Sequence, residues 1–389
     1  MRGRLVEAIW TPDSSIYAPP RYRKPCRYEA FVPDTLERLP ALDPAVAGTI
    51  SHAEASIRAL NSVAQPALQP LARLLLRTES VASSKVEGMQ LDARTLARAE
   101  ARSDLGETVG REAVEILSNI NAMQLAVEAA TSAPELTLDH LLQTHAVLLA
   151  DAAAQNPGEF RTVQNWIGGN DYNPCGAAFV PPPPDDLRPL LDDLISFCND
   201  ESLPALAQAG LAHAQFETIH PFADGNGRTG RALTQMLLRR RGLAPDYVPP
   251  ISVVFAADKE RYIRGLVAFR EANENQWLES FAVSAARAAD LATSYLDEVR
   301  SLQQEWRERL AALGLRSDAA AWLLVEVLPA HPIISAPVAV TATQRSRPAV
   351  QQGIDQLVAI GVLAPLSESQ RNRQWEARGL LNLIADVTG

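Results

Sequence analysis

The sequence predicts a mainly α-helical protein that ends in a small winged-helix domain. Apolar residues recur at helical spacing through most of residues 43–132 and 136–298. Strand-like segments are short and confined to two places, residues 162–180 and 362–377. Near the C-terminus, three helical segments precede the second of these places, which is the order of elements in a winged helix.

The composition is that of an ordinary globular protein. The 389 residues suffice for a large core and two or three modules, and 47% of them are hydrophobic and 21% charged. A net charge of -10 argues against general affinity for nucleic acid or for an acidic membrane surface, although a local basic patch is compatible with it. No run approaches the roughly 18 apolar residues of a membrane span, and the N-terminus lacks the apolar core of a signal peptide.

The cysteine content predicts neither a disulfide framework nor a zinc site. The chain has three cysteines, Cys26, Cys175 and Cys198, and they are too few and too scattered for either. A reducing environment fits them best, so we expect the protein to be cytoplasmic.

The N-terminal third is predicted to be an arm followed by helices. Residues 1–45 carry many prolines and aromatic residues with little helical period, so we expect an extended arm laid over a neighbouring surface. Residues 43–132 then predict a series of helices, and the sequence SSKVEG at Ser83–Gly88 lies between two of them. Spacing alone favours a helix end there, with Gly88 as a left-handed cap.

A helix over residues 136–149 leads into a region of different character. Thr137 is its expected N-cap, and His140 and His145 on the helix are expected to be packing residues without a catalytic role. Residues 157–184 are rich in glycine and proline and include two short extended pieces, so they predict a β-hairpin. On this pattern alone the hairpin either covers a site or merely connects helices.

The rest of the chain is predicted to be helical up to the C-terminal domain. Apolar and small residues at helical spacing predict helices over residues 185–199, 204–219, 228–240, 260–268 and 276–298. The C-terminal part then predicts helices over 319–328 and 348–360, a short segment at 335–341, and strands over 362–365 and 374–377.

The stretch His220–Arg231, with the sequence HPFADGNGRTGR, contains the residue types that a triphosphate site needs. Gly225, Asn226 and Gly227 stand where a helix begins, so their backbone N–H groups point outward from its positive end and can hold phosphate oxygens. Asp224 beside them is a hard-oxygen ligand suited to Mg²⁺.

Two cations and a base complete this stretch. Arg228 and Arg231 lie three residues apart on one face of the following helix and can neutralise the distal phosphates. His220 ends the preceding helix, and an imidazole can take a proton from an incoming hydroxyl near neutral pH. Any two of these residues would be explained by helix capping, but all of them together predict a phosphoryl- or nucleotidyl-transfer site.

HPFADGNGRTGR resembles the motif of the Fic family, H-x-F-x-[D/E]-G-N-G-R-x-x-R, at every specified position. The resemblance implies a Fic-type helical bundle that transfers AMP from Mg-ATP to Ser, Thr or Tyr hydroxyls of a protein target. It implies His220 as the general base, Phe222 as the core anchor of the loop and Asp224 as the metal ligand. It implies ATP and phosphate contacts from Gly225, Asn226, Gly227, Arg228, Thr229, Gly230 and Arg231. Glycine at position 227, where related Doc-type kinases carry lysine, favours adenylylation over phosphorylation.

The resemblance includes an inhibitory motif. SSKVEG is similar to the family's [S/T]-x-x-x-E-[G/N], with Ser83, Glu87 and Gly88 at its specified positions. In the family this glutamate pairs with the second arginine of the loop, which is Arg231 here, and blocks a productive γ-phosphate position. The physical basis is that a carboxylate on the arginine occupies the two donors that a phosphate would use.

Other segments are also similar to members of the family. Residues 166–184 resemble the flap, a hairpin that aligns an extended segment of the target by strand addition. Its expected docking residues are Trp166, Ile167, Gly168 and Gly169. Tyr262 stands where many members line the adenine pocket, and YEAFVPDTL near the start resembles the extra N-terminal Fic region.

These likenesses imply three parts. We expect an N-terminal Fic-associated region with an inhibitory helix over 1–110, a Fic catalytic core over 111–300, and a linker helix with the winged-helix domain over 301–389. Several family members dimerise and thereby hold the inhibitory helix, so a homodimer is one expectation. The arginines placed where a winged helix usually meets DNA are Arg345, Arg347, Arg371, Arg373 and Arg378. They form a modest patch, so DNA binding is not favoured over protein binding.

Two other functions stay open at this point. A nucleotide-sensing transcriptional regulator would show salt-dependent DNA binding that is lost on substitution of Arg345 and Arg347. A deadenylylase would use Glu87 to position a water molecule and would act on an adenylylated target without ATP. The intact motif at His220–Arg231 favours the adenylyltransferase, while the intact Glu87 keeps the deadenylylase open.

Overall fold

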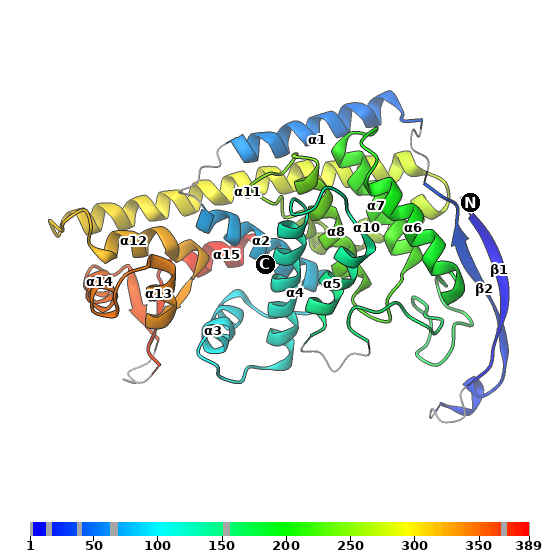
Figure 1. Cartoon of the computed structure of the whole chain (residues 1–389), viewed down its shortest axis with the longest axis horizontal. Coiled ribbons are helices and arrows are strands. Elements are labelled where there is room, and N and C mark those ends of the chain that lie inside the picture. Colours follow the sequence, from blue (N-terminus) through cyan, green and yellow to red (C-terminus); the bar gives the residue numbers. More distant parts are fainter. Residues whose placement is uncertain are drawn as a thin grey trace. The chain divides into compact units, whose positions relative to one another are not determined.

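The computed structural model describes residues 3–12, 18–36, 41–62, 69–150, 156–366 and 372–388, and most of them are helical (Figure 1). The chain divides into two compact units. Unit 1 comprises residues 1–54, 121–243 and 258–284, and unit 2 comprises residues 55–120, 244–257 and 285–389. The boundaries predicted at residues 110 and 300 stay a prediction.

Unit 1 is a helical bundle. Its helices are α5 (Leu138–Leu148), α6 (Leu187–Cys198), α7 (Ala205–Ile219), α8 (Asn226–Arg240) and α10 (Lys259–Arg270). The first part of α1 (Pro44–Ser62), the last part of α4 (Arg111–Ala129) and the start of α11 (Glu274–Ala311) also belong to it.

Helix α7 is the centre of this bundle, and it packs along α8 (Figure 1). Every residue of α7 except Glu217 is buried. The alanines and the glycine of α7 make this possible, because small side chains let neighbouring helices approach closely. Gly210 lies so close to α11 that an added Cβ would stand 2.9 Å from the ring of Phe281. The apolar residues of α8 that the sequence predicted to face inward are fully buried, namely Leu233, Met236, Leu237 and Leu238.

The N-terminal arm is extended, as predicted, and folds into a hairpin. Strands β1 (Gly3–Trp10) and β2 (Cys26–Pro33) pair antiparallel in a register that runs from Gly3↔Pro33 to Trp10↔Cys26 (Figure 1). The hairpin packs on residues 166–180 through three aromatic pairs, Trp10–Trp166, Tyr22–Tyr172 and Phe31–Phe179. The Phe31 N–H also donates to the Val180 carbonyl at 2.9 Å.

The expectation that the cysteines are too scattered for disulfides was wrong, because Cys26 and Cys175 form one. The two residues are 149 positions apart in the sequence, and they meet only because β2 packs on the loop that contains Cys175. Such a pairing leaves no trace in cysteine spacing. The cysteines therefore give no support for a reducing compartment, and the third cysteine, Cys198, is buried and takes no part in the disulfide.

Unit 2 contains helices α2 (Gln69–Val86), α3 (Ala93–Ser103) and α9 (Ile251–Ala257) together with the C-terminal elements. Polar side chains hold α2 in place, because Asn119 donates to the Ser80 carbonyl at 2.7 Å and the Glu79 carboxylate accepts from the backbone N–H of Ser252 at 2.9 Å. Gly88 follows the helix with φ of +94°, so the predicted left-handed cap after α2 is present.

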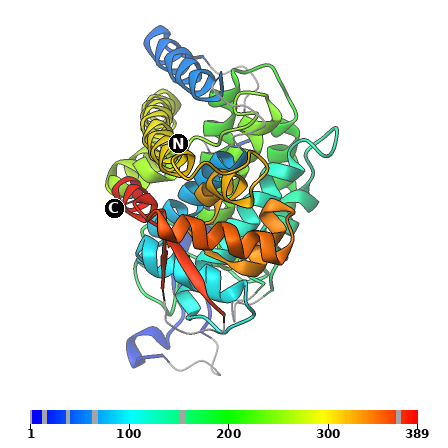
Figure 2. The same ribbon diagram turned by 90° about the vertical axis from the view of Figure 1, so that its left-hand side faces the viewer.

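The C-terminal part of unit 2 consists of α12 (Ala320–Val327), β3 (Ile333–Ser335), α13 (Ala336–Thr343), α14 (Arg347–Ala359), β4 (Leu363–Pro365), β5 (Gln374–Ala377) and α15 (Leu380–Thr388). The strands form an antiparallel sheet in the order β3-β5-β4, and Figure 2 shows α14 in orange beside the strands of this sheet. The three helices and the hairpin occur in the predicted order, while β3 and α15 are additions. The assignment of this part to the winged-helix family stays a prediction, and Arg371 lies outside the described residues.

Helix α11 is longer than the sequence predicted, because it continues to Ala311 without a break. Within the described part of the chain, no helix combines the length and the apolar character that crossing a membrane requires.

Candidate active site

The motif predicted to bind phosphate forms the junction between α7 and α8 in unit 1. Helix α7 ends at His220, whose backbone is left-handed with φ of 51° and ψ of 60°, and the following Pro221 prevents continuation of the helix. Gly225, with φ of 75°, turns the chain into α8, which begins at Asn226. The loop between the helices is therefore a tight turn with a left-handed residue at each end.

Side chains from the loop and from an earlier segment hold the loop carbonyls. The side chain of Asn226 accepts from the N–H of Phe222 and donates to its carbonyl, both at 2.8 Å. Arg161 Nε donates to the His220 carbonyl at 2.9 Å, and Asn165 Nδ2 donates to the Phe222 carbonyl at 3.0 Å. The side chain of Asn226 thus shapes the loop, which leaves only its backbone N–H for the predicted phosphate contact.

His145 on α5 fixes the middle of the loop. Its Nδ1 accepts from the backbone N–H of Gly158 at 2.9 Å, so its proton is on Nε2, which donates to the Asp224 carbonyl at 3.0 Å. Its ring stacks on Phe222 with 3.7 Å between centroids and an interplanar angle of 6°. Phe222 is fully buried, as expected for the core anchor of the loop.

The start of α8 offers an anion-binding site. No side chain of the described residues caps this helix, so the first backbone N–H groups, at Asn226 and Gly227, have no partner inside the helix. Arg228 is only 4% exposed, and its Nε and Nη1 have no hydrogen-bond partner within the described protein. Its ion pair is weak, with 3.7 Å between Nη2 and Asp224 Oδ2. Buried donors without partners are costly, and an anion would satisfy them.

Arg231, one turn further along α8, is 2% exposed. Between the two arginines, Thr229 is fully buried and Gly230 lies against α7, where an added Cβ would stand 2.4 Å from Glu217 Oε1. A side chain at position 230 would therefore displace Glu217 and press on Phe216 of α7, so helix packing favours glycine there.

Asp224 is an exposed residue of the motif, like Ala223 before it. Its side chain is 66% exposed, and its Oδ1 accepts from the N–H of Gly225 at 2.6 Å. No group of three or more metal-binding side chains exists among the described residues. A single carboxylate fits Mg²⁺ that is held mainly by nucleotide phosphates, because Mg²⁺ in such sites usually takes only one or two protein carboxylates.

Tyr262 on α10 is 6% exposed, and its hydroxyl lies 2.9 Å from His213 Nε2 on α7. His213 also lies against Trp277 and Phe281. Complete burial lowers the pKa of His213 to about 3, so it is neutral at neutral pH. The predicted adenine-pocket residue therefore belongs to a buried aromatic group on the side of α7 that faces α10.

The predicted flap is reduced to a single β-bridge between Ile167 and Phe179, with hydrogen bonds of 2.8 and 3.1 Å. Gly168 and Gly169 turn the chain with φ of 74° and 82°, and Trp166 Nε1 donates to the Asn170 carbonyl at 2.6 Å. Ile167 is 39% exposed, so the hairpin presents apolar surface. The short hairpin depends on the arm β1–β2 packed against it.

The residues of the predicted inhibitory motif lie in unit 2, whereas the loop at His220–Arg231 lies in unit 1. Ser83 is buried in the last turn of α2, and Glu87 and Gly88 are exposed in the turn that follows. The pairing of Glu87 with Arg231 stays a prediction.

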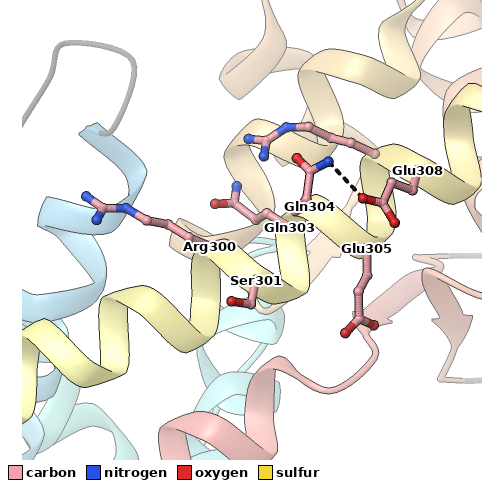
Figure 3. Close-up of a pocket in the computed structure, with 7 residues that line it drawn as sticks. Arg300, Ser301, Gln303, Gln304, Glu305 and Glu308 are labelled. Carbon is pink, nitrogen blue, oxygen red and sulfur yellow. Dashed lines mark hydrogen bonds between the residues drawn. The ribbon is translucent and has the colours of Figure 1, made fainter.

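A separate hollow of about 610 Å³ lies along α11 in unit 2 (Figure 3). It is lined by Arg300, Ser301, Gln303, Gln304, Glu305, Arg307 and Glu308. Charges of both signs alternate there, and Gln304 donates to Glu308 at 3.0 Å, so the lining favours no class of ligand. None of the predicted site residues belongs to it.

A helical bundle with this loop between α7 and α8 is the architecture of a Fic domain. Residues 135–238 match the model of the Fic/DOC family, and residues 48–128 match that of the Fic/DOC family N-terminal region. The chain therefore contains a Fic/DOC domain preceded by the N-terminal region of that family.

Relatives with known names support this. The chain is 32% identical to protein adenylyltransferase Fic of Drosophila grimshawi over 169 residues, which are 42% of this chain and 33% of that protein. It is 27% identical to protein adenylyltransferase fic-1 of Caenorhabditis elegans over 163 residues, which are 39% of this chain and 30% of the relative. The chain thus spans about a third of the length of the relatives that it matches.

Solved structures share the fold. A Fic family protein from Desulfovibrio desulfuricans G20 matches with a TM-score of 0.52 and 21% identity over 87% of this chain and 98% of that one. Fic-1 from Caenorhabditis elegans matches with a TM-score of 0.51 and 18% identity over 65% of this chain and 73% of that one.

The sequence did not predict the hydrogen bonds by which three residues hold the loop. His145, Arg161 and Asn165 all make their contacts to backbone carbonyls of the loop, across 55 to 79 positions of the sequence. Such contacts follow no local spacing. In the sequence, only the high glycine and proline content of residues 157–184 set this segment apart. That composition predicted a hairpin but did not show which part of the chain it contacts.

Proposed function

We propose that the protein is a protein adenylyltransferase that transfers AMP from Mg-ATP to a Ser, Thr or Tyr hydroxyl of a protein target and of itself. The observation that carries this proposal is the anion-binding site at the start of α8, in the same loop-helix junction as His220 and Asp224. There the Nε and Nη1 of buried Arg228 have no hydrogen-bond partner among the described residues. Triphosphate oxygens are suitable acceptors for the N–H groups of Asn226 and Gly227 and for the donors of Arg228.

The order of groups along the loop supports one course of reaction. His220 accepts the proton of the target hydroxyl while that oxygen bonds to the α-phosphorus, and the bond from the α-phosphorus to the oxygen bridging to the β-phosphate breaks. Pyrophosphate leaves with the electron pair of that bond. Arg228 and Arg231 bind the β- and γ-phosphates and stabilise the charge on the leaving group. Asp224 is proposed to hold Mg²⁺, which would neutralise phosphate charge.

The activity is proposed to be restrained by Glu87, with Ser83 and Gly88 forming the end of the inhibitory helix. A carboxylate paired with Arg231 would displace the γ-phosphate and so prevent a productive orientation of ATP. We also propose that Tyr262 contributes to the adenine pocket, that Trp166, Ile167, Gly168 and Gly169 dock the target, and that the protein works in the cytoplasm. A homodimer would hold α2, while DNA binding by the C-terminal domain is not favoured.

Labelling with ATP tests the proposal. Incubation with Mg²⁺ and ATP labelled in the adenosine part should label the protein itself, and the Glu87→Gly variant should be labelled more strongly. His220→Ala should abolish transfer and leave ATP binding intact, because only the base is removed. Absence of labelling in both the wild type and Glu87→Gly would refute the proposal.

A further inference from the structure

Arg161 is a buried cation whose partners are all backbone carbonyls. It follows α5 and precedes the flap, and only 5% of it is exposed. Burial lowers the pKa of its guanidinium to about 10, so the cation persists at neutral pH. Every hydrogen bond of its guanidinium within the described residues goes to a main-chain oxygen. A buried charge needs such compensation, and here carbonyl dipoles supply it.

The four carbonyls belong to two structures that meet at Arg161. Nε donates to the His220 carbonyl at 2.9 Å and Nη2 lies 3.5 Å from the Ile219 carbonyl, so one side of the guanidinium binds the end of α7. Nη2 also donates to the Pro182 carbonyl at 2.6 Å, and Nη1 lies 3.4 Å from the Val163 carbonyl. Val163 lies just before the flap (residues 166–184) and Pro182 lies near its end, so the other side binds the chain at both ends of the flap.

The contact with His220 acts on a strained residue. A non-glycine residue in the left-handed region costs roughly 1–2 kcal/mol, and His220 persists there with φ of 51°. Its carbonyl accepts from Arg161 Nε, and the backbone N–H of Arg161 donates to the Pro221 carbonyl at 2.9 Å. These two bonds fix the peptide groups on either side of the Cα of Pro221, and so help to fix the direction in which the His220 side chain leaves the backbone.

We propose that Arg161 is a positioning residue that fixes the target-docking flap relative to His220. The role rests on the proposed adenylyltransferase function, because it sets the distance between a hydroxyl docked on the flap and the proposed base. Among the described residues, no hydrogen bond of the Arg161 guanidinium reaches the start of α8 or Arg228, so ATP binding should not depend on it. Lysine cannot replace it, since one ammonium group lacks the planar set of donors that reaches α7 and both ends of the flap at once.

The experiment compares Arg161→Lys with the wild type and with Arg188→Lys as a matched control. Arg188 lies on α6 in the same unit, and its side chain is 71% exposed. Hydrogen exchange of the Ile167 and Phe179 amides should become at least about tenfold faster in Arg161→Lys only. The rate of AMP transfer at saturating ATP should fall roughly 10- to 100-fold, because a misplacement of about 1 Å costs that much. The dissociation constant of Mg-ATP should stay within about threefold of the wild-type value.

Three outcomes would overturn the inference. Unchanged exchange of the flap amides would show that Arg161 does not hold the flap. An unchanged transfer rate would show that flap position does not matter to His220. A loss of ATP affinity in parallel with the rate would show a general structural defect. Should Arg161→Lys not fold, Arg161→Gln keeps a donor without an unpaired buried charge. If neither the wild type nor Glu87→Gly transfers AMP, the proposed function fails, while flap exchange still decides whether Arg161 joins the flap to α7.

Discussion

Arg228 should lower the stability of the nucleotide-free protein. Its Nε and Nη1 are buried and have no hydrogen-bond partner in the described part of the chain, and each unsatisfied buried donor costs about 1–3 kcal/mol. Arg228→Met removes both donors and keeps most of the aliphatic stem. It also removes the 3.7 Å ion pair with Asp224, which contributes at most about 1 kcal/mol because that carboxylate is mostly exposed. The free energy of unfolding without nucleotide should therefore rise by about 1–6 kcal/mol.

The assay is urea denaturation of the wild type, Arg228→Met and the exposed-site control Arg188→Met, each with and without Mg-ATP. The control should change by less than about 0.5 kcal/mol. ATP at about 100 times its dissociation constant should stabilise the wild type by about 2.7 kcal/mol, and Arg228→Met should gain little of this. If Arg228→Met is less stable than the wild type without ATP, then the unsatisfied donors of Arg228 do not destabilise the nucleotide-free protein, and the reasoning is refuted.

Three further predictions concern the rest of unit 1. Cys26→Ser should lower the free energy of unfolding by about 2–5 kcal/mol in urea denaturation, because the Cys26–Cys175 disulfide closes a loop of 149 residues; an equal loss in the wild type with a dithiol reductant would confirm the cause. Burial lowers the pKa of His213 from 6.5 in the unfolded chain to about 3 in the folded protein. Between these two pH values the unfolded chain binds a proton that the folded protein does not, so the free energy of unfolding decreases as the pH falls from 6.5 toward 3. Urea denaturation from pH 8 to 5 should show a smaller pH dependence in His213→Gln than in the wild type, and identical slopes would contradict this. Gly210→Ala should lower the melting temperature, because the new Cβ would stand 2.9 Å from the Phe281 ring and overpacking costs about 1–3 kcal/mol. An unchanged melting temperature would show that Phe281 and α11 can shift to make room for the methyl group without loss of stability.

The sequence was most informative where chemistry and local structure coincide. The glycines and the proline between His220 and Arg231 set the turn, so the helix ends on either side of it could be predicted. The base and the phosphate contacts assigned to the same stretch stay a prediction. Likewise, the small residues of α7 predicted its buried position, because helix packing depends on side-chain size along one element.

Long-range partners could not be predicted in this way. Cys26 meets Cys175, and Arg161 meets His220, only after the intervening helices have packed. His145 was expected to be a packing residue, which is true of its stack on Phe222, but its hydrogen bond to the Asp224 carbonyl depends on a loop 79 positions away. Periodicity reports the face of a helix that is buried and says nothing of what it is buried against.

The contact between the N-terminal hairpin and the flap has a consequence for biosynthesis. Trp10 and Tyr22 are made early, but Trp166 and Tyr172, on which they pack, emerge about 150 residues later. At a translation rate of 5–20 residues per second the hairpin waits roughly 10–30 s with its aromatic side chains and strand edges uncovered. A nascent chain in this interval is exposed to wrong pairing, so a chaperone that shields short β-hairpins during translation should raise the yield of folded protein.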